Sequence, residues 1–110
     1  MIERILHITT EREWADAKAV GAYTADSLAM EGFIHCSKPE QVVWVANQRF
    51  RGRTDLVLLH IDPSRLAARV LYENLEGGEQ LFPHVYGPIP VSAVVGVTPF
   101  RPCADGTFAV

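Results

Sequence analysis

Cysteine is scarce in this sequence, and no metal-binding pattern involves it. Cys36 and Cys103 are the two cysteines among 110 residues, and neither belongs to a Cys-x-x-Cys pair. No two histidines are spaced as His-x-x-x-His, and the neighbours His35 and Cys36 would point to opposite faces of a strand. We therefore expect no metal cofactor. A cysteine-protease pairing with His84 is also disfavoured, because Cys36 is expected to face the core and Cys103 to lie in a loose tail.

Long hydrophobic runs are also missing. The longest apolar stretches, residues 42–46 and 56–59, are far shorter than the roughly 20 residues that span a bilayer. Residues 1–4 lead directly into a strand-like segment, without the basic and apolar regions of a signal peptide. We therefore expect no membrane partner, a cytoplasmic location and two reduced thiols.

An excess of positive charge is missing as well. Ten Lys and Arg residues stand against thirteen Asp and Glu residues, which gives a formal net charge of −3. Arg49, Arg51 and Arg53 form the only basic cluster; they fit the solvated end of a helix, although they could also hold one phosphate group. Long nucleic acid is therefore not an expected partner.

The composition that remains is that of an ordinary globular protein, with 48% hydrophobic and 21% charged residues. The length fits one domain, and no linker, repeat or low-complexity segment interrupts it. Residues 1–110 are therefore predicted to form a single compact α+β domain, with a mixed or antiparallel sheet and two main helices.

Strand and helix signals alternate along the chain. The predicted strands are residues 4–9, 33–36, 55–61, 70–73 and 93–98. The predicted helices are residues 10–20, 25–31 and 39–50, ended by Gly21, Gly32 and Gly52. The strand at residues 55–61 is the most apolar, so it is expected to lie centrally in the sheet.

Two stretches have the spacing of a helix capping box. Thr10 and Glu13 have it at the first helix, and Ser37 and Glu40 at the third. A helix that begins at Ser37 would present free N–H groups and a positive dipole end, which attract a phosphate or carboxylate. The simpler interpretation is that Ser37 only caps the helix.

All four histidines lie on predicted strands or at strand edges: His7, His35, His60 and His84. A lone strand histidine is more often a core or rim side chain satisfied by a backbone carbonyl than a catalytic group. Here His7 precedes Thr9 by two residues and His35 likewise precedes Ser37, so each pair shares one strand face. This repeated pattern indicates a site for a phosphorylated small ligand.

The stretch 82–90 is rich in proline and aromatic residues. Its three prolines remove backbone donors, so we expect a sheet edge or a loop that crosses the core. His84 and Tyr86 would share one side of it and form a stiff ligand wall, or the stretch only covers the sheet; Tyr23 faces the same choice. We predict one pocket with His60 outside it, lined by His7, Thr9, His35, Ser37, His84 and Tyr86.

Residues along the whole chain resemble the bacterial family called domain of unknown function 952. The resemblance is carried by residues 5–9, 14, 21–23, 27–28, 31–37, 41, 46–47, 50, 55–59, 72–73 and 82–88. That family implies a fold and a site but no established reaction.

Two strand motifs are also similar to those of ADP-ribosyltransferase-like folds, especially RNA 2′-phosphotransferases. Residues 6–9 (Leu-His-Ile-Thr) resemble their Tyr-His-Gly-Thr motif, and residues 34–37 (Ile-His-Cys-Ser) their Val-His-Leu-Ser motif. The resemblance implies an ADP-ribosyltransferase-like fold in which His7 and His35 contact the nicotinamide ribose. The third catalytic position would then fall within residues 84–86, so His84 and Tyr86 are the candidates.

The same resemblance implies NAD, as a substrate, or an ADP-ribose-like nucleotide as the ligand. Ile8 stands where the first motif has glycine, and no glutamate marks the third position, which disfavours phosphotransfer from RNA. The expected ligand-binding residues are Thr9, Tyr23, Ser37 and Asn47. Two other functions stay open: a non-catalytic module that binds a small ligand or a partner, and a metal-dependent hydrolase.

Overall fold

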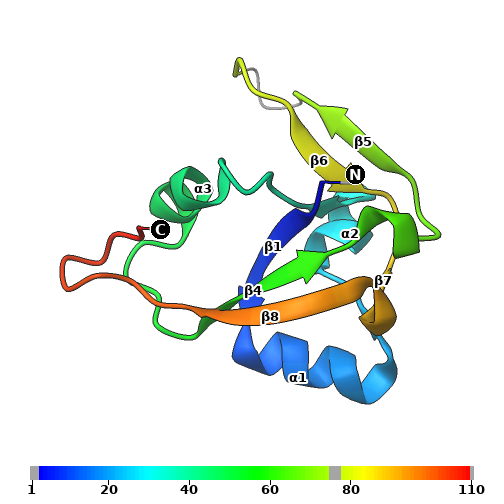
Figure 1. The fold of residues 1–110 in the computed structure, drawn as a ribbon, viewed down its shortest axis with the longest axis horizontal. Helices are drawn as coiled ribbons and strands as arrows, with labels where there is room; N and C mark the ends of the chain where they lie inside the picture. Colours follow the sequence, from blue (N-terminus) through cyan, green and yellow to red (C-terminus); the bar gives the residue numbers. More distant parts are fainter. Residues whose placement is uncertain (1–2, 75–77, 110) are drawn as a thin grey trace.

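The computed structural model describes residues 3–74 and 78–109, which form antiparallel sheets and three α-helices (Figure 1). In chain order the elements are β1 (Ile5–Thr10), α1 (Glu11–Val20), β2 (Ala22–Tyr23), α2 (Asp26–Glu31), β3 (Ile34–His35), α3 (Val42–Arg49), β4 (Leu56–Ile61), the 3₁₀ turn η1 (Pro63–Arg65), β5 (Val70–Glu73), β6 (Phe82–Val85), β7 (Ile89–Pro90), the 3₁₀ turn η2 (Val91–Ala93) and β8 (Val94–Phe100). The α+β class is therefore confirmed, and the three helices lie within the three predicted helical segments.

The central sheet has the strand order β1-β4-β8. Every residue of β4 except His60 is buried, so the prediction that the most apolar strand lies centrally is confirmed. His7 lies opposite Leu59 and Leu6 lies opposite His60 in the β1–β4 ladder. Because successive residues of a strand alternate between faces, His7 and His60 are on opposite faces of this sheet.

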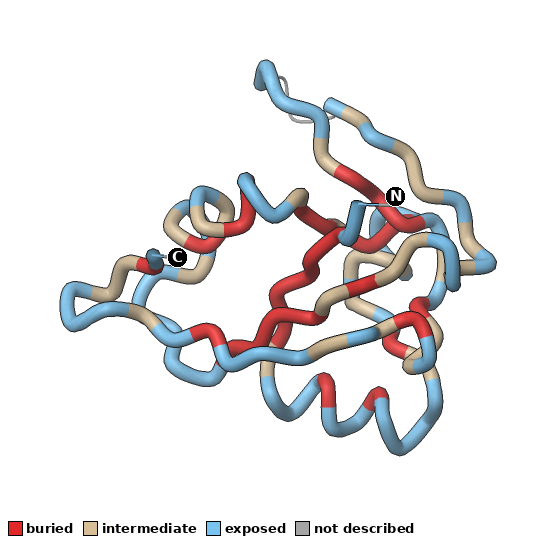
Figure 2. Tube along the Cα trace, viewed as in Figure 1, coloured by how far each residue is buried: buried red, intermediate tan, exposed pale blue. Residues whose placement is uncertain are grey.

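Each face of the central sheet carries its own apolar core. On one face, Trp14 and Ala17 of α1 pack with Ile5 and Leu59. On the other face, α3 packs through its buried residues Val42 and Ala46 against a second cluster, made of Leu6, Ile8, Leu56, Leu58, Phe100 and Phe108. Figure 2 shows the result as continuous buried stretches along β1 and β4, the strands between the two cores.

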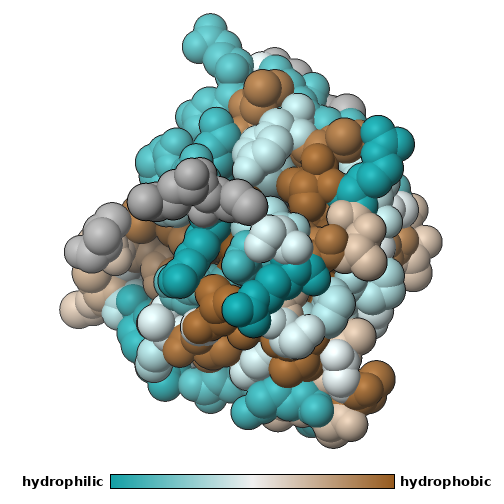
Figure 3. All heavy atoms as spheres, turned by 45° about the vertical axis from the view of Figure 1, so that its right-hand side comes forward, coloured by the Kyte–Doolittle hydropathy of each residue, from teal (hydrophilic) through white to brown (hydrophobic). Residues whose placement is uncertain are grey.

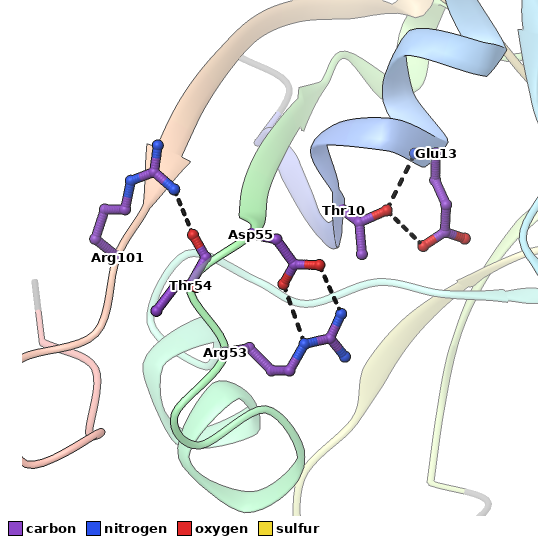
Figure 4. A network of polar contacts seen from close by, with 6 residues as sticks. All are labelled: Thr10, Glu13, Arg53, Thr54, Asp55 and Arg101. Atoms are coloured by element: carbon purple, nitrogen blue, oxygen red, sulfur yellow. Dashed lines mark hydrogen bonds and ion pairs between the residues drawn. The ribbon is translucent and has the colours of Figure 1, made fainter.

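The predicted N-cap at Thr10 is confirmed at the start of α1. The Glu13 amide donates to Thr10 Oγ1 at 3.0 Å, and this hydroxyl donates to Glu13 Oε1 at 3.0 Å (Figure 4). Close by, Arg53 donates to both carboxylate oxygens of Asp55, at 3.0 and 2.9 Å. The helix ends where Gly21 adopts a φ of 100°, a left-handed conformation that favours glycine.

The second capping box is wrong, and α3 begins five residues later than Ser37. Ser37 is held instead in a β-bridge with Leu6, through N–H···O contacts of 2.7 and 2.8 Å in the two directions. Lys38 N donates to the Gln41 side chain at 3.0 Å, and the helix proper starts at Val42 with Gln41 as its cap residue. Pairing with β1 keeps Ser37 extended, so no helix N-terminus lies there.

The stretch 82–90 is neither a loop nor a sheet edge at its start, because β6 is the middle strand of the sheet β3-β6-β5. His35 lies opposite His84 in the β3–β6 ladder. Pro83 has no backbone N–H to donate, but its carbonyl still accepts from Cys36 N at 3.0 Å. The absent N–H would face Cys36, which lies one residue past the end of β3, so the β3–β6 ladder itself loses no hydrogen bond. None of the described helices is long and apolar enough to cross a membrane.

Candidate functional site

A cavity of about 210 Å³ lies between the β3-β6-β5 sheet, β1 and α3. It is lined by His7, Ile8, Ser27, His35, Cys36, Ser37, Trp44, Val45, Arg49, Phe50, Glu73, Phe82 and His84. Four of the six residues predicted to share a pocket are among them, whereas Thr9 and Tyr86 are not. His60 lies outside the cavity, as predicted, and its Nε2 is 3.0 Å from the Thr98 hydroxyl.

The β1 and β3 segments meet at this cavity although they belong to different sheets. The bridge between Leu6 and Ser37 joins the two backbones. Beside it, Nδ1 of His7 lies 2.5 Å from the carbonyl oxygen of His35. The two predicted His-x-Ser/Thr strands are therefore neighbours, connected by main-chain contacts rather than by a shared ladder.

Both ring nitrogens of His7 are engaged inside the protein. A carbonyl oxygen can only accept, so Nδ1 of His7 donates to His35; Nε2 of the neutral ring is then an acceptor for the Tyr23 hydroxyl, at 2.8 Å. The Thr9 hydroxyl completes this chain 3.1 Å from Tyr23. Burial lowers the pKa of His7 from 6.5 to about 4 and raises that of Tyr23 to about 12, so both stay neutral near pH 7.

A second polar group is built around Glu73 at the end of β5. Its Oε1 accepts from His84 Nδ1 at 3.0 Å and from the Tyr86 hydroxyl at 2.5 Å. These hydrogen bonds, with that from Tyr86 the larger influence, lower the pKa of Glu73 and keep it ionised. The His84 side chain is only 5% exposed, so a carboxylate and a mostly buried imidazole form one wall of the cavity.

Aromatic contacts fix the orientation of His84. Phe33 stacks on His84 with ring centroids 4.3 Å apart and also contacts the rings of His35 and Tyr86, at 4.8 and 5.3 Å. His35 itself reaches outward, where its Nε2 lies 2.8 Å from Glu31 Oε2. His84 is therefore locked in position, whereas His35 is a half-exposed side chain at the rim.

The opposite side of the cavity is mostly apolar and comes from α3. Trp44 and Phe82 stack with centroids 6.2 Å apart, and Trp44 is 53% exposed. Arg49 adds a positive charge to this wall. On the face drawn in Figure 3, hydrophobic patches are small and separated by hydrophilic residues, so no broad apolar surface competes there with the cavity as a binding region.

Besides Tyr86, three predicted residues lie away from the cavity wall. Thr9 and Tyr23 are buried behind His7, and Tyr23 belongs to the core beside α1. Asn47 faces the C-terminal segment: its Oδ1 accepts from Phe108 N at 2.7 Å, and its Nδ2 donates to the carbonyl of Phe108 at 3.3 Å.

Sequence reasoning gave no role to Glu73 or Phe33, and it considered Arg49 only within a basic cluster that could hold one phosphate group. The alternation of the β5 strand places Glu73 on one face, but its partner depends on the register between β5 and β6. That register pairs Glu73 with Phe82 and Leu71 with His84. No local pattern announces such a pairing.

Metal chemistry needs grouped ligand side chains, and thiol chemistry needs an ionised thiol. Over residues 3–74 and 78–109, no three His, Cys, Asp or Glu side chains are grouped so that they could hold a metal ion. Cys36 lines the cavity but is buried, and burial raises the pKa of its thiol well above the ordinary value. A neutral thiol is a poor nucleophile.

Comparisons with known proteins agree with the fold. The family model described as "Protein of unknown function (DUF952)" matches residues 8–97. A crystal structure of protein CC0527 from Caulobacter crescentus is 36% identical, with a TM-score of 0.86 over 96% of this chain and 93% of that one. The solution NMR structure of CC0527 is 36% identical with a TM-score of 0.82, over 94% and 90% of the two chains. No curated protein matches significantly.

Proposed function

The chain belongs to the DUF952 family of proteins of unknown function, and we propose that its cavity binds NAD or an ADP-ribose-like nucleotide. The observation that supports this most is that His7, His35, Ser37 and His84 meet at one cavity. Those residues include both strand motifs that resemble ADP-ribosyltransferase-like folds, and kinship with such folds is part of the proposal. The DUF952 name itself supplies no ligand.

The size and lining of the cavity suit one end of such a nucleotide. Its volume of about 210 Å³ lies below the roughly 300–1,000 Å³ of pockets that enclose a drug-sized ligand. It would therefore hold one ring and its ribose, with the rest of the ligand outside. Trp44, Phe50 and Phe82 offer apolar surfaces to a planar ring.

Isothermal titration with NAD, ADP-ribose and nicotinamide tests the proposal. We expect the native chain to bind. We expect the dissociation constant of His35→Ala to be about tenfold larger, a loss of about 1.4 kcal/mol in binding free energy. His60→Ala is the matched control, because His60 is also partly exposed but lies outside the cavity, and it should bind within about twofold of the native chain. No heat with any of the three ligands at millimolar concentration would refute the proposal.

A non-catalytic binding module is the second candidate, favoured by the engagement of both His7 nitrogens within the protein. In that case His7 shapes the cavity and has no ring nitrogen left for a ligand. The module should show a rise in melting temperature that grows with NAD concentration as RT ln(1 + [L]/Kd), with no product. Consumption of NAD that His35→Ala abolishes would rule it out.

A further inference from the structure

The hydrogen-bond pattern around Glu73 determines which nitrogen of His84 carries the proton. Glu73 is ionised and can only accept, so Nδ1 of His84 is the N–H that donates to it at 3.0 Å. When the ring is neutral, Nε2 is then a lone-pair acceptor. The Tyr86 hydroxyl donates to the same carboxylate oxygen and holds it in place.

The second nitrogen of His84 is not used in a hydrogen bond within the described part of the protein. Nε2 makes no hydrogen bond to any residue that the structure describes, and no buried side-chain nitrogen or oxygen of those residues is left unpaired. Nε2 must therefore be reachable from outside the protein interior. His84 is 4% exposed and lines the cavity, so we infer that this accessible atom opens into it.

We propose that the Glu73–His84 pair is the proton acceptor for a hydrolytic reaction on the nucleotide in this cavity. The inference rests on the proposed function and adds a catalytic group to it. A carboxylate that orients a histidine, whose other nitrogen faces a reacting group, is a general-base arrangement. Glu73 acts here as a positioning residue and His84 as the catalytic one.

The step it would carry with NAD is loss of nicotinamide to water. A water molecule attacks the ribose carbon that bears the nicotinamide, and one of its protons passes to Nε2 of His84. The new C–O bond forms as the C–N bond breaks, and nicotinamide leaves with the bonding electron pair as a neutral molecule. The ionised Glu73 stabilises the imidazolium, which then returns its proton to solvent, so the products are ADP-ribose, nicotinamide and one proton.

Charged and titratable groups surround His84 on every side that packs against it. Glu73 comes from β5, Tyr86 follows β6 and His35 comes from β3. His7 and Arg49 line the same cavity from β1 and α3. Glu73 is the carboxylate in hydrogen-bond contact with the His84 ring, so it is the group that would stabilise the imidazolium formed in this step.

The test measures nicotinamide release and NAD affinity in the same protein samples. His84→Gln should lower the rate of release by about 10²–10⁴-fold. Glu73→Gln keeps an oxygen that can accept from Tyr86 and should lose at least about tenfold in rate, with an affinity for NAD within about threefold of the native value. His60→Gln should leave both unchanged. Nitrogen NMR of the native chain should show the Nδ1–H tautomer at His84, and circular dichroism confirms that each variant folds.

The possible failures point to different conclusions. Binding of NAD without release of nicotinamide would overturn the role of the Glu73–His84 pair and leave the proposed binding function intact. A native release rate in Glu73→Gln, or an Nε2–H tautomer at His84, would overturn it as well. Absence of NAD binding would refute the proposed ligand and this inference together.

Discussion

At the residue scale, the environment of His7 explains why an imidazole is placed inside an apolar core. Its two nitrogens are satisfied by the His35 carbonyl and the Tyr23 hydroxyl, so burial leaves no unpaired polar atom. The contact joins β1, β2 and β3, three segments that share no ladder with one another. The histidine that the sequence suggested as a ribose contact is thus also a structural link.

Tyr23→Phe should lower the free energy of unfolding by about 1–3 kcal/mol. The substitution keeps the ring but leaves Nε2 of His7 buried without a donor, and an unpaired buried acceptor costs that much. Tyr72→Phe is the matched control, because Tyr72 is 44% exposed and should change stability by less than about 0.5 kcal/mol. Urea unfolding measures both; equal effects would contradict the hydrogen bond to His7.

The low pKa of His7 should make the protein less stable in mild acid. The unfolded chain binds a proton near pH 6.5, whereas the folded state resists it down to about pH 4 because His7 is buried. This contribution is fully present above pH 6.5 and is lost as the pH falls from there to 4, with about 2 kcal/mol lost between pH 7 and 5. Urea unfolding at several pH values should show a shallower dependence in His7→Gln; identical slopes would contradict the assignment.

At the scale of single elements, local signals predicted the strands and the first helix well. β1, β4 and β5 lie within one residue of their predicted bounds, because apolar alternation and turn residues act over a few positions. The predicted start of α3 and the predicted position of β6 at a sheet edge or in a loop were wrong, because both depend on partners distant in the sequence. Ser37 pairs with Leu6, and β6 pairs on both sides, contacts that no local pattern encodes.

The two capping boxes should respond differently to alanine. Thr10→Ala removes the acceptor for the Glu13 amide and should lower the free energy of unfolding by about 1 kcal/mol. Ser37→Ala should lower it by less than about 0.5 kcal/mol, because the bridge to Leu6 uses only the Ser37 backbone. Thermal and urea unfolding of both variants check this; an equal loss at Ser37 would mean that its side chain caps a helix after all.

At the scale of the whole molecule, the candidate site was predictable only where strand alternation decides which side chains share a face. His35 and Ser37 reach the cavity with His84, as alternation and the pairing of β3 with β6 require. Tyr86 was predicted to line the cavity, but its hydroxyl donates to Glu73 instead. The position of Glu73 relative to Tyr86 depends on the β5–β6 register. A cavity assembled from six separate segments depends on tertiary contacts that local sequence patterns do not supply.

The C-terminal segment closes the second core through Phe108. Phe108 is 4% exposed, and the centroid of its ring lies 4.6 Å from that of Phe100. The Asn47 side chain binds the backbone of Phe108 through two hydrogen bonds. Phe108→Ala should lower the free energy of unfolding by about 3–5 kcal/mol, as expected for an aromatic ring removed from a core. Leu81→Ala, at a side chain 48% exposed, is the control and should have a small effect.

Asn47→Ala tests whether the same segment is held by side-chain hydrogen bonds. Loss of the two contacts to Phe108 should lower the free energy of unfolding by about 1–3 kcal/mol, because they pair backbone groups of a buried residue. Asn47→Ala and Phe108→Ala release the same segment. The double variant should therefore lose less free energy of unfolding than the sum of the two single losses, by about 0.5 kcal/mol or more. Urea unfolding of the four proteins measures this coupling. A segment that one substitution has already released has little stability left to lose from the other. Strict additivity would therefore contradict the coupling and mean that Asn47 and Phe108 stabilise the core independently.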